Sequence, residues 1–275
     1  MAIVLNCKVG INHPEEQKTM RIDGRGDMEL RKISITTGVM PNAYGSASVE
    51  FGRTKVYCTA MVENGTPPFL EGAGKGWLTA EYAMLPASCP KRKMREKMKP
   101  DGRSMEIQRL IGRSLRSILD FKKLGEVTVY IDCDVICADG GTRTASITGA
   151  FVALCQAVDR GMREGMFSSS PIVNSLAAVS AGLVDDTPLL DLCYVEDSRA
   201  QADMNMVATG DGGIAEVQVC GEERTISQRE FATLVNMCKA GIQEIVKIQT
   251  EALGSSAHVI PGALNMQTDE EPAKE

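Results

Sequence analysis

The chain has 275 residues, a hydrophobic fraction of 43%, a charged fraction of 24% and a net charge of −6. These values are typical of a globular protein, and a chain of this length can bury a full core. No apolar run approaches the roughly 18 residues that a membrane span needs, and the first residues lack the apolar core of a secretory signal. We therefore expect neither a membrane protein nor a secreted one.

Hydrophobic periodicity and turn residues predict the elements in chain order. They are a hairpin over 47–62, a helix over 104–121, a strand over 126–137, a helix over 144–164, a strand pair over 175–184 and 189–195, a hairpin over 207–219 and a helix over 227–253. Residues 1–20 are predicted to form an N-terminal tail, and 254–275 a polar, acidic C-terminal tail. This order predicts an α+β protein with two β-rich halves, each covered by helices, over residues 21–253.

Cysteine and histidine usage excludes several kinds of catalytic site. The nine cysteines include no Cys-x-x-Cys pair, and four of them lie in apolar stretches, where reduced, buried thiols of a cytoplasmic protein are expected: Cys58, Cys133, Cys155 and Cys193. The two histidines, His13 and His258, lie in the terminal segments. A Ser-His-Asp triad, a Cys-His protease or a histidine-ligated zinc site needs histidine in the core. Carboxylates, arginines, backbone amides or a bound metal must therefore carry the chemistry.

Positive charge is concentrated in one segment. Residues 91–123 hold twelve Lys/Arg and four acidic residues, a net +8, while the rest of the chain carries −14. Such a segment attracts polyanions, although a solvated surface gives the same pattern. In the loop before it, Phe69 follows two prolines, where an exposed ring can stack on a base or simply pack.

The sequence Asp139-Gly140-Gly141-Thr142-Arg143 joins the predicted strand over 126–137 to the following helix. Two glycines allow a ligand to approach the backbone, and the helix start offers unpaired N–H groups and a positive dipole end. Thr142 adds a hydroxyl and Arg143 a bidentate donor for phosphate oxygens. The pattern therefore suits an anion site, and it also suits a glycine turn selected for helix packing.

Two pairs of carboxylates are candidates for metal or acid–base chemistry. Asp197 and Asp203 follow an apolar strand and can converge on one divalent ion, or they can cap a turn and begin a strand. Asp132 and Asp134 share one face of the strand over 126–137, an arrangement that suits either a metal or a buried structural role.

Taken together, five stretches closely resemble the bacterial ribonuclease PH family, and the resemblance covers residues 20–253. The stretches occur in the family's order and lie at 76–86, 101–113, 131–150, 194–198 and 202–205. The resemblance implies a fold like domain 2 of ribosomal protein S5, with mixed sheets covered by helices. It also implies a homohexamer, built as a trimer of dimers, that removes nucleotides from RNA 3′ ends, notably of tRNA precursors, by phosphorolysis.

The resemblance also assigns site residues. It implies a phosphate site on Arg103, Gly141, Thr142 and Arg143. It further implies catalytic carboxylates at Asp197 and Asp203, which would also be the ligands of a magnesium ion, and RNA-binding arginines at Arg92 and Arg95.

One departure concerns Ala87, because many relatives carry arginine there, and the stretch before Gly102 is also shorter. Both changes affect the expected strength of tRNA binding and leave the expected phosphate site unchanged. The alternative function is a catalytically silent, RNA-binding subunit of an exosome-like ring. Such subunits usually lose the phosphate arginines or the acidic pair, and this chain keeps both.

Overall fold

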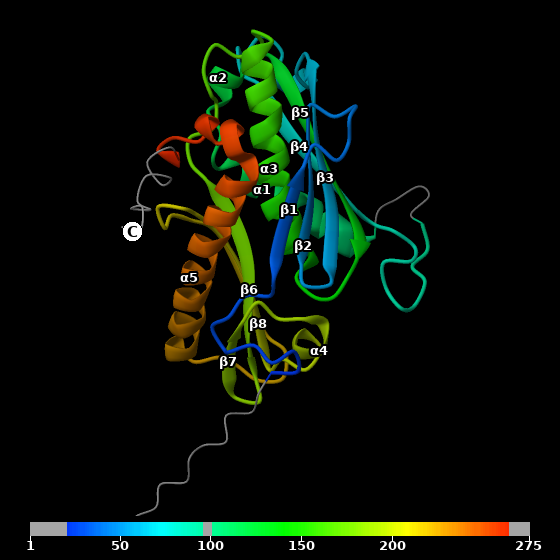
Figure 1. Cartoon of the computed structure of the whole chain (residues 1–275), viewed down its shortest axis with the longest axis vertical. Coiled ribbons are helices and arrows are strands. Elements are labelled where there is room, and N and C mark those ends of the chain that lie inside the picture. Colours follow the sequence, from blue (N-terminus) through cyan, green and yellow to red (C-terminus); the bar gives the residue numbers. More distant parts are fainter. Residues whose placement is uncertain (1–20, 96–100, 264–275) are drawn as a thin grey trace, which may run out of the picture.

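The computed structural model describes residues 21–95 and 101–263, which form two β-sheets and the helices packed on them (Figure 1). The first sheet has the strand order β1 (Ile33–Thr37), β2 (Gly45–Phe51), β3 (Thr54–Asn64), β5 (Val127–Cys137) and β4 (Trp77–Met84). Only β4 and β5 pair in parallel in this sheet. The second, fully antiparallel sheet has the order β7 (Thr187–Leu190), β6 (Leu176–Val184), β8 (Ala202–Thr209) and β9 (Ile214–Gly221).

The helices connect and cover these sheets. They are α1 (Gly102–Arg116), α2 (Phe121–Leu124), α3 (Thr142–Arg163), α4 (Tyr194–Asp197) and α5 (Gln228–Leu253), with two 3₁₀ turns, η1 (Pro68–Leu70) and η2 (Gly254–Val259). Within the two described ranges, no helix is both long enough and apolar enough to cross a membrane.

Helix α3 contacts both sheets and lies at the centre of the core (Figure 1). Seventeen of its 22 residues are buried, and most of these are small. Small side chains let the backbones of α3 and the first sheet approach closely, so an added Cβ at Gly149 would lie 2.7 Å from Val49 Cγ1. The strand that precedes α3, β5, buries the alternating apolar positions that the sequence predicts, from Val127 to Val135.

Helix α5 covers the second sheet. Its predicted capping box is confirmed: Ser227 Oγ accepts from the Glu230 amide at 3.2 Å, and Glu230 Oε2 accepts from the Ser227 amide at 2.7 Å. Strand β6 contacts both α3 and α5, and all nine of its residues are buried. Gln249 of α5 donates to the carbonyl oxygens of Thr148 and Leu176, and so connects the two helices with this strand.

Several predicted boundaries are wrong. The tail expected from 254 is packed as far as 263, where η2 and the next residues bury four apolar side chains in the main core: Ala257, Val259, Ile260 and Ala263. The strand expected over 189–195 ends at Leu190, and α4 follows. The helix expected to reach Phe121 ends at Arg116, because Asp120 caps a separate helix, α2, by accepting from the amides of Lys122 and Lys123. The expected N-terminal tail 1–20 and the acidic residues 264–275 lie outside the described residues.

The eight cysteines of the described ranges are free thiols. Cys58, Cys133, Cys155 and Cys193 are buried, as expected from their apolar surroundings. His258 lies on η2, where its Nδ1 atom is 2.8 Å from the Ser255 carbonyl oxygen.

Candidate active site

The predicted anion loop lies between β5 and α3 and depends on its two glycines. Gly140 and Gly141 have φ angles of +75° and +63°, which L-residues rarely adopt. A Cβ at Gly140 would lie 2.7 Å from the Leu192 carbonyl oxygen, so the loop passes directly against the segment that leads into α4. Gly141 is the N-cap of α3 and has no side chain with which to cap the helix. The start of a 22-residue helix therefore opens on the space beside this loop.

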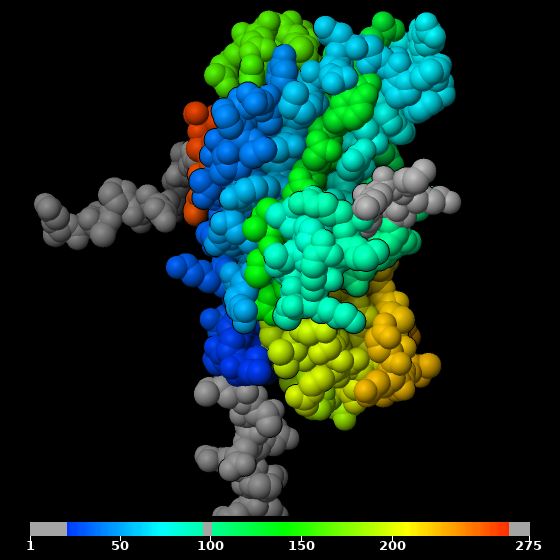
Figure 2. All heavy atoms as spheres, turned by 90° about the vertical axis from the view of Figure 1, so that its right-hand side faces the viewer, coloured from blue at the N-terminus to red at the C-terminus, as the bar shows by residue number. Residues whose placement is uncertain are grey.

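That space is a pocket of about 500 Å³, with the starts of α1 and α3 on one side and α4 and the second sheet on the other. Figure 2 faces this side of the molecule and shows the residues just after 100 directly above the segment near 190–200. The pocket is lined by Arg103, Gly141, Thr142, Arg143, Ser180, Asp197, Ser198, Ala200, Asp203, Asn205, Glu222 and Glu223. The structure thus brings together all six residues that the sequence placed in the phosphate site and in the acidic pair.

The two pocket arginines come from the starts of two helices. Arg103 lies in the first turn of α1, whose N-cap Asp101 accepts from the Ser104 amide at 2.6 Å. That bond, together with the Lys93 ammonium 3.1 Å away, lowers the pKa of Asp101 to about 2. Arg143 lies in the first turn of α3, and its Nη1 atom is 2.9 Å from Gln218 Oε1 and 3.4 Å from Glu106 Oε1. Arg143 is therefore held from β9 and α1 at the pocket edge.

The two carboxylates lie opposite the anion loop. Asp197 ends α4, and Asp203 lies near the start of β8. Desolvation raises the pKa of the Asp197 carboxyl, and the charges of Arg103 and Arg143 oppose this rise. Desolvation also raises the pKa of Asp203, and the negative charges of Asp197 and Glu222 raise it further. The pocket therefore combines positive charge at the helix starts with carboxyls that hold protons more readily than usual.

Glu222 lines the pocket although the sequence reasoning did not single it out. Asp203, Cys220 and Glu222 have ligand atoms within 4.8 Å of one another, and Asp197 is outside this group although it lines the same pocket. Carboxylate oxygens are donors that Mg²⁺ prefers, so Asp203 and Glu222 fit such an ion, whereas a thiol is a poor magnesium ligand. Glu222 follows β9. The hairpin predicted over 207–219 is confirmed as β8 paired with β9, but the predicted strands were too short to reach Asp203 and Glu222 and so did not bring these two residues together.

Tyr82 of β4 supports the anion loop from the first sheet. Its hydroxyl donates to Thr142 Oγ1 at 2.9 Å. Burial raises the pKa of this phenol, so the hydroxyl keeps its proton and remains a donor.

The other candidates lie away from this pocket. Asp132 and Asp134 do not line it, and desolvation, together with the charge of Glu81, raises the pKa of both carboxyls. Phe69 is 67% exposed, and its ring packs edge-on against Trp77 with ring centroids 5.2 Å apart.

The predicted RNA-binding arginines Arg92 and Arg95 are exposed in the segment between β4 and α1, outside the pocket lining. The lysines at 97 and 99 of the same basic segment lie outside the described residues.

Known proteins match this chain over most of its length. The 3′ exoribonuclease family matches residues 29–158 with its domain 1 and 174–241 with its domain 2. Ribonuclease PH of Halalkalibacterium halodurans is 49% identical over 257 residues, which are 92% of this chain and 100% of that protein. Ribonuclease PH of Bacillus mycoides is 51% identical over 238 residues, which are 86% of this chain and 97% of that protein.

Solved structures with lower identity share the fold. An Archaeoglobus fulgidus exosome with RNA bound to the active site superposes with a TM-score of 0.72 at 24% identity, over 83% of this chain and 92% of that one. Rice Rrp46 superposes with a TM-score of 0.70 at 19% identity, over 85% of this chain and 100% of that one. With two family domains matched and about half of the residues shared with full-length relatives, this chain belongs to the ribonuclease PH family of 3′ exoribonucleases.

Proposed function

We propose that the pocket between the starts of α1 and α3 and the second sheet is the active site with which this phosphorolytic 3′-to-5′ exoribonuclease shortens RNA. One observation carries the assignment: two arginines and two aspartates from four separate elements line one pocket beside the start of α3. Both cations and both carboxylates are therefore in place, which favours an active enzyme over a silent RNA-binding subunit.

Inorganic phosphate is proposed to bind among Arg103, Arg143 and the start of α3. In phosphorolysis a phosphate oxygen attacks the phosphorus of the last phosphodiester, so the protein needs no activated serine, cysteine or histidine. The protein must instead hold two anions side by side, and the two guanidinium groups and the helix dipole offset that repulsion. Thr142 adds a hydroxyl, which Tyr82 orients.

The bond that breaks joins this phosphorus to the 3′ oxygen of the preceding nucleotide. The products are a nucleoside 5′-diphosphate and an RNA that is one nucleotide shorter, with a free 3′ hydroxyl. The leaving 3′ oxygen needs a proton, which the attacking hydrogen phosphate loses. Asp203, whose pKa is raised chiefly by desolvation, suits this transfer; alternatively, Asp203 is a metal ligand, with Asp197 orienting it or sharing the ion.

Magnesium is the proposed cofactor. Asp203 and Glu222 supply oxygen atoms within 4.8 Å of each other, and Asp197 lines the same pocket. An ion held there would offset negative charge on the phosphates and on the leaving oxygen. Magnesium removal with a chelator should therefore abolish activity, and added Mg²⁺ should restore it.

The proposed substrate is the 3′ end of RNA, tRNA precursors in particular. The exposed Arg92 and Arg95 belong to the segment of net charge +8 and would contact the strand through its phosphates, independently of sequence. The family resemblance supports a homohexamer, which light scattering would detect. The free thiols suit a reducing cytoplasm.

A 3′-extended tRNA incubated with the protein and Mg²⁺, with and without phosphate, tests this function. We expect shortening only with phosphate, and nucleoside diphosphates as the products. Shortening without phosphate, or release of monophosphates, would refute phosphorolysis. A protein that binds labelled RNA in a gel but never shortens it would support the silent-subunit alternative.

A further inference from the structure

A buried ion pair joins the two family domains behind the active site. Arg31 precedes β1 in the first domain, and Asp191 follows β7 in the second. Arg31 Nη2 lies 2.7 Å from Asp191 Oδ1, and its Nε lies 3.0 Å from Oδ2. The Arg31 amide also donates to Oδ2, at 2.8 Å. Asp191 has no exposed surface and Arg31 is 5% exposed, so water competes little for these bonds.

The same guanidinium holds the anion loop. Arg31 Nη1 donates to the Asp139 carbonyl oxygen at 2.7 Å. A Cβ at Gly141 would lie 2.9 Å from Arg31 Nη2, so the guanidinium packs directly against the loop. On the other side of the loop, the Thr54 hydroxyl donates to the Gly140 carbonyl at 2.6 Å and accepts from the Asp139 amide. The loop is thus fixed to the first sheet by Thr54 and to the second domain through Arg31.

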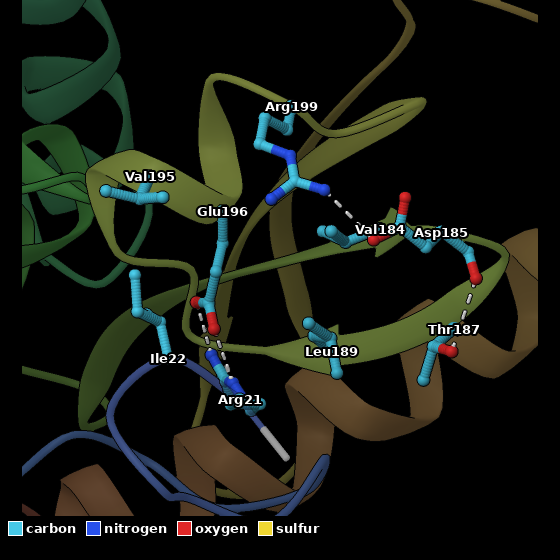
Figure 3. Close-up of a pocket in the computed structure, with 9 residues that line it drawn as sticks. All are labelled: Arg21, Ile22, Val184, Asp185, Thr187, Leu189, Val195, Glu196 and Arg199. Carbon is cyan, nitrogen blue, oxygen red and sulfur yellow. Dashed lines mark hydrogen bonds and ion pairs between the residues drawn. The ribbon is translucent and has the colours of Figure 1, made fainter. Parts of the chain in front are cut away.

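A second ion pair, Arg21–Glu196, holds the segment that carries Asp197. Arg21 donates through Nε to Glu196 Oε1 at 2.7 Å and through Nη2 to Oε2 at 2.6 Å, and Figure 3 shows these two contacts side by side. Arg21 also donates to the carbonyl oxygens of Leu190 and Asp191. Glu196 immediately precedes Asp197 in the single-turn helix α4. The residues around Asp191 and Asp197 are therefore held as one unit.

Resting on the proposed function, we infer that Arg31 and Asp191 are positioning residues that set the separation between the phosphate loop and Asp197. The loop belongs to one domain and the carboxylates to the other, and this pair is bonded to both sides at once. A planar guanidinium that makes two parallel bonds to a carboxylate fixes orientation as well as distance. Replacement of a buried ion pair by apolar residues is often neutral for stability, so a geometric role is the better explanation of this one.

The test replaces Arg31 with lysine, which keeps the charge and loses the planar fork. We expect kcat/KM for phosphate to fall on the order of tenfold to a hundredfold, because a small misplacement of reacting groups has such effects. A higher KM for phosphate should account for part of the loss. RNA affinity in a gel shift should stay at the wild-type value, because Arg92 and Arg95 are untouched. Asp191→Asn, which keeps the volume and removes the charge, should act in the same direction.

Arg163→Lys is the matched control. Arg163 pairs with Asp159 at 3.1 Å in the last turn of α3, the helix that begins at the anion loop. At about 1.5 Å per residue, this turn lies roughly 30 Å from Thr142. Its phosphorolysis should be unchanged. The second readout is stabilisation by phosphate against heat, which requires no turnover. It should be present in the wild type and in Arg163→Lys and reduced in Arg31→Lys and Asp191→Asn.

The outcomes distinguish failure of the proposed function from failure of the positioning role of Arg31 and Asp191. If the wild type releases no nucleoside diphosphate, the proposed function fails, while the phosphate-dependent stabilisation still tests the positioning. Wild-type phosphate parameters in a folded Arg31→Lys or Asp191→Asn would overturn the positioning role. Failure of both variants to fold would also overturn it, because the pair would then be required for the fold itself.

Discussion

The replacement of Arg143 by alanine separates catalysis from stability. The Arg143 side chain is 20% exposed, and it contacts the Gln218 amide oxygen at 2.9 Å and the half-exposed carboxylate of Glu106 at 3.4 Å. A hydrogen bond to a neutral amide contributes about 1 kcal/mol, and a largely solvated ion pair at most about that much. We therefore expect the free energy of unfolding to fall by about 1–2 kcal/mol, which lowers Tm by roughly 2–8 °C.

The expected effect on the reaction is much larger. Arg143 is one of two guanidinium groups at the proposed phosphate site. Loss of one fixed donor to developing negative charge typically lowers kcat by about 10² to 10³. Arg143→Lys should lie between alanine and wild type, because it keeps the charge and loses the bidentate geometry.

The assay measures nucleoside diphosphate release from a 3′-extended tRNA at several phosphate concentrations, with Tm measured on the same samples. Arg163→Ala, at the far end of α3, is the control, and it should show a small change in Tm and wild-type turnover. An Arg143→Ala protein that remains folded and keeps activity within about threefold of the wild type would refute the assignment. The Arg143 side chain would then stabilise the transition state by less than about 1 kcal/mol.

Three further predictions concern stability and pH. Asp203→Asn should abolish activity yet raise the free energy of unfolding at pH 8: the raised pKa of the native carboxyl makes its ionised form unfavourable in the folded state. This gain should vanish as the pH falls below the unfolded pKa of about 3.8, and urea titrations at several pH values that show no such convergence would contradict the assigned shift. Gly140→Ala should cost roughly 1–3 kcal/mol in urea unfolding, because φ is +75° and the new Cβ would lie 2.7 Å from the Leu192 carbonyl oxygen; a neutral substitution would show that the loop relaxes. Ser227→Ala should cost about 1 kcal/mol through loss of the α5 cap, and Ser227→Thr, which keeps the hydroxyl, should recover most of it.

The elements with strong periodicity could be predicted from the sequence. Strand β5 alternates apolar residues, and α5 begins with a capping box, so local chemistry alone identifies both. Strands β1 and β4 were missed, although both alternate: Leu78, Ala80 and Tyr82 of β4 are buried in the core, and Ile33 and Ile35 of β1 pack against it. The buried 254–263 segment was also missed, because its few apolar residues acquire a role only against the assembled core.

Some residues of the candidate site could be predicted from the local sequence, and others could not. The loop around Gly141 is continuous in the chain, so its glycines and its arginine indicate an anion site from the sequence alone, beside the alternative of a turn selected for helix packing. The pairing of β8 with β9 brings Glu222 beside Asp203, and the contact between the domains forms the Arg31–Asp191 pair behind the pocket. Residues that are 160 positions apart carry no local signal of their contact.

The central claim is that free phosphate supplies the attacking oxygen, and the fate of radiolabelled phosphate tests it most directly. Incubation of the protein with unlabelled 3′-extended tRNA, Mg²⁺ and labelled phosphate should place the label in the β-phosphate of every released nucleoside diphosphate. The label should appear at the rate at which the RNA shortens, and Arg143→Ala should suppress both together. Shortening of the RNA while all the label remains inorganic would show that water is the nucleophile and would contradict the account.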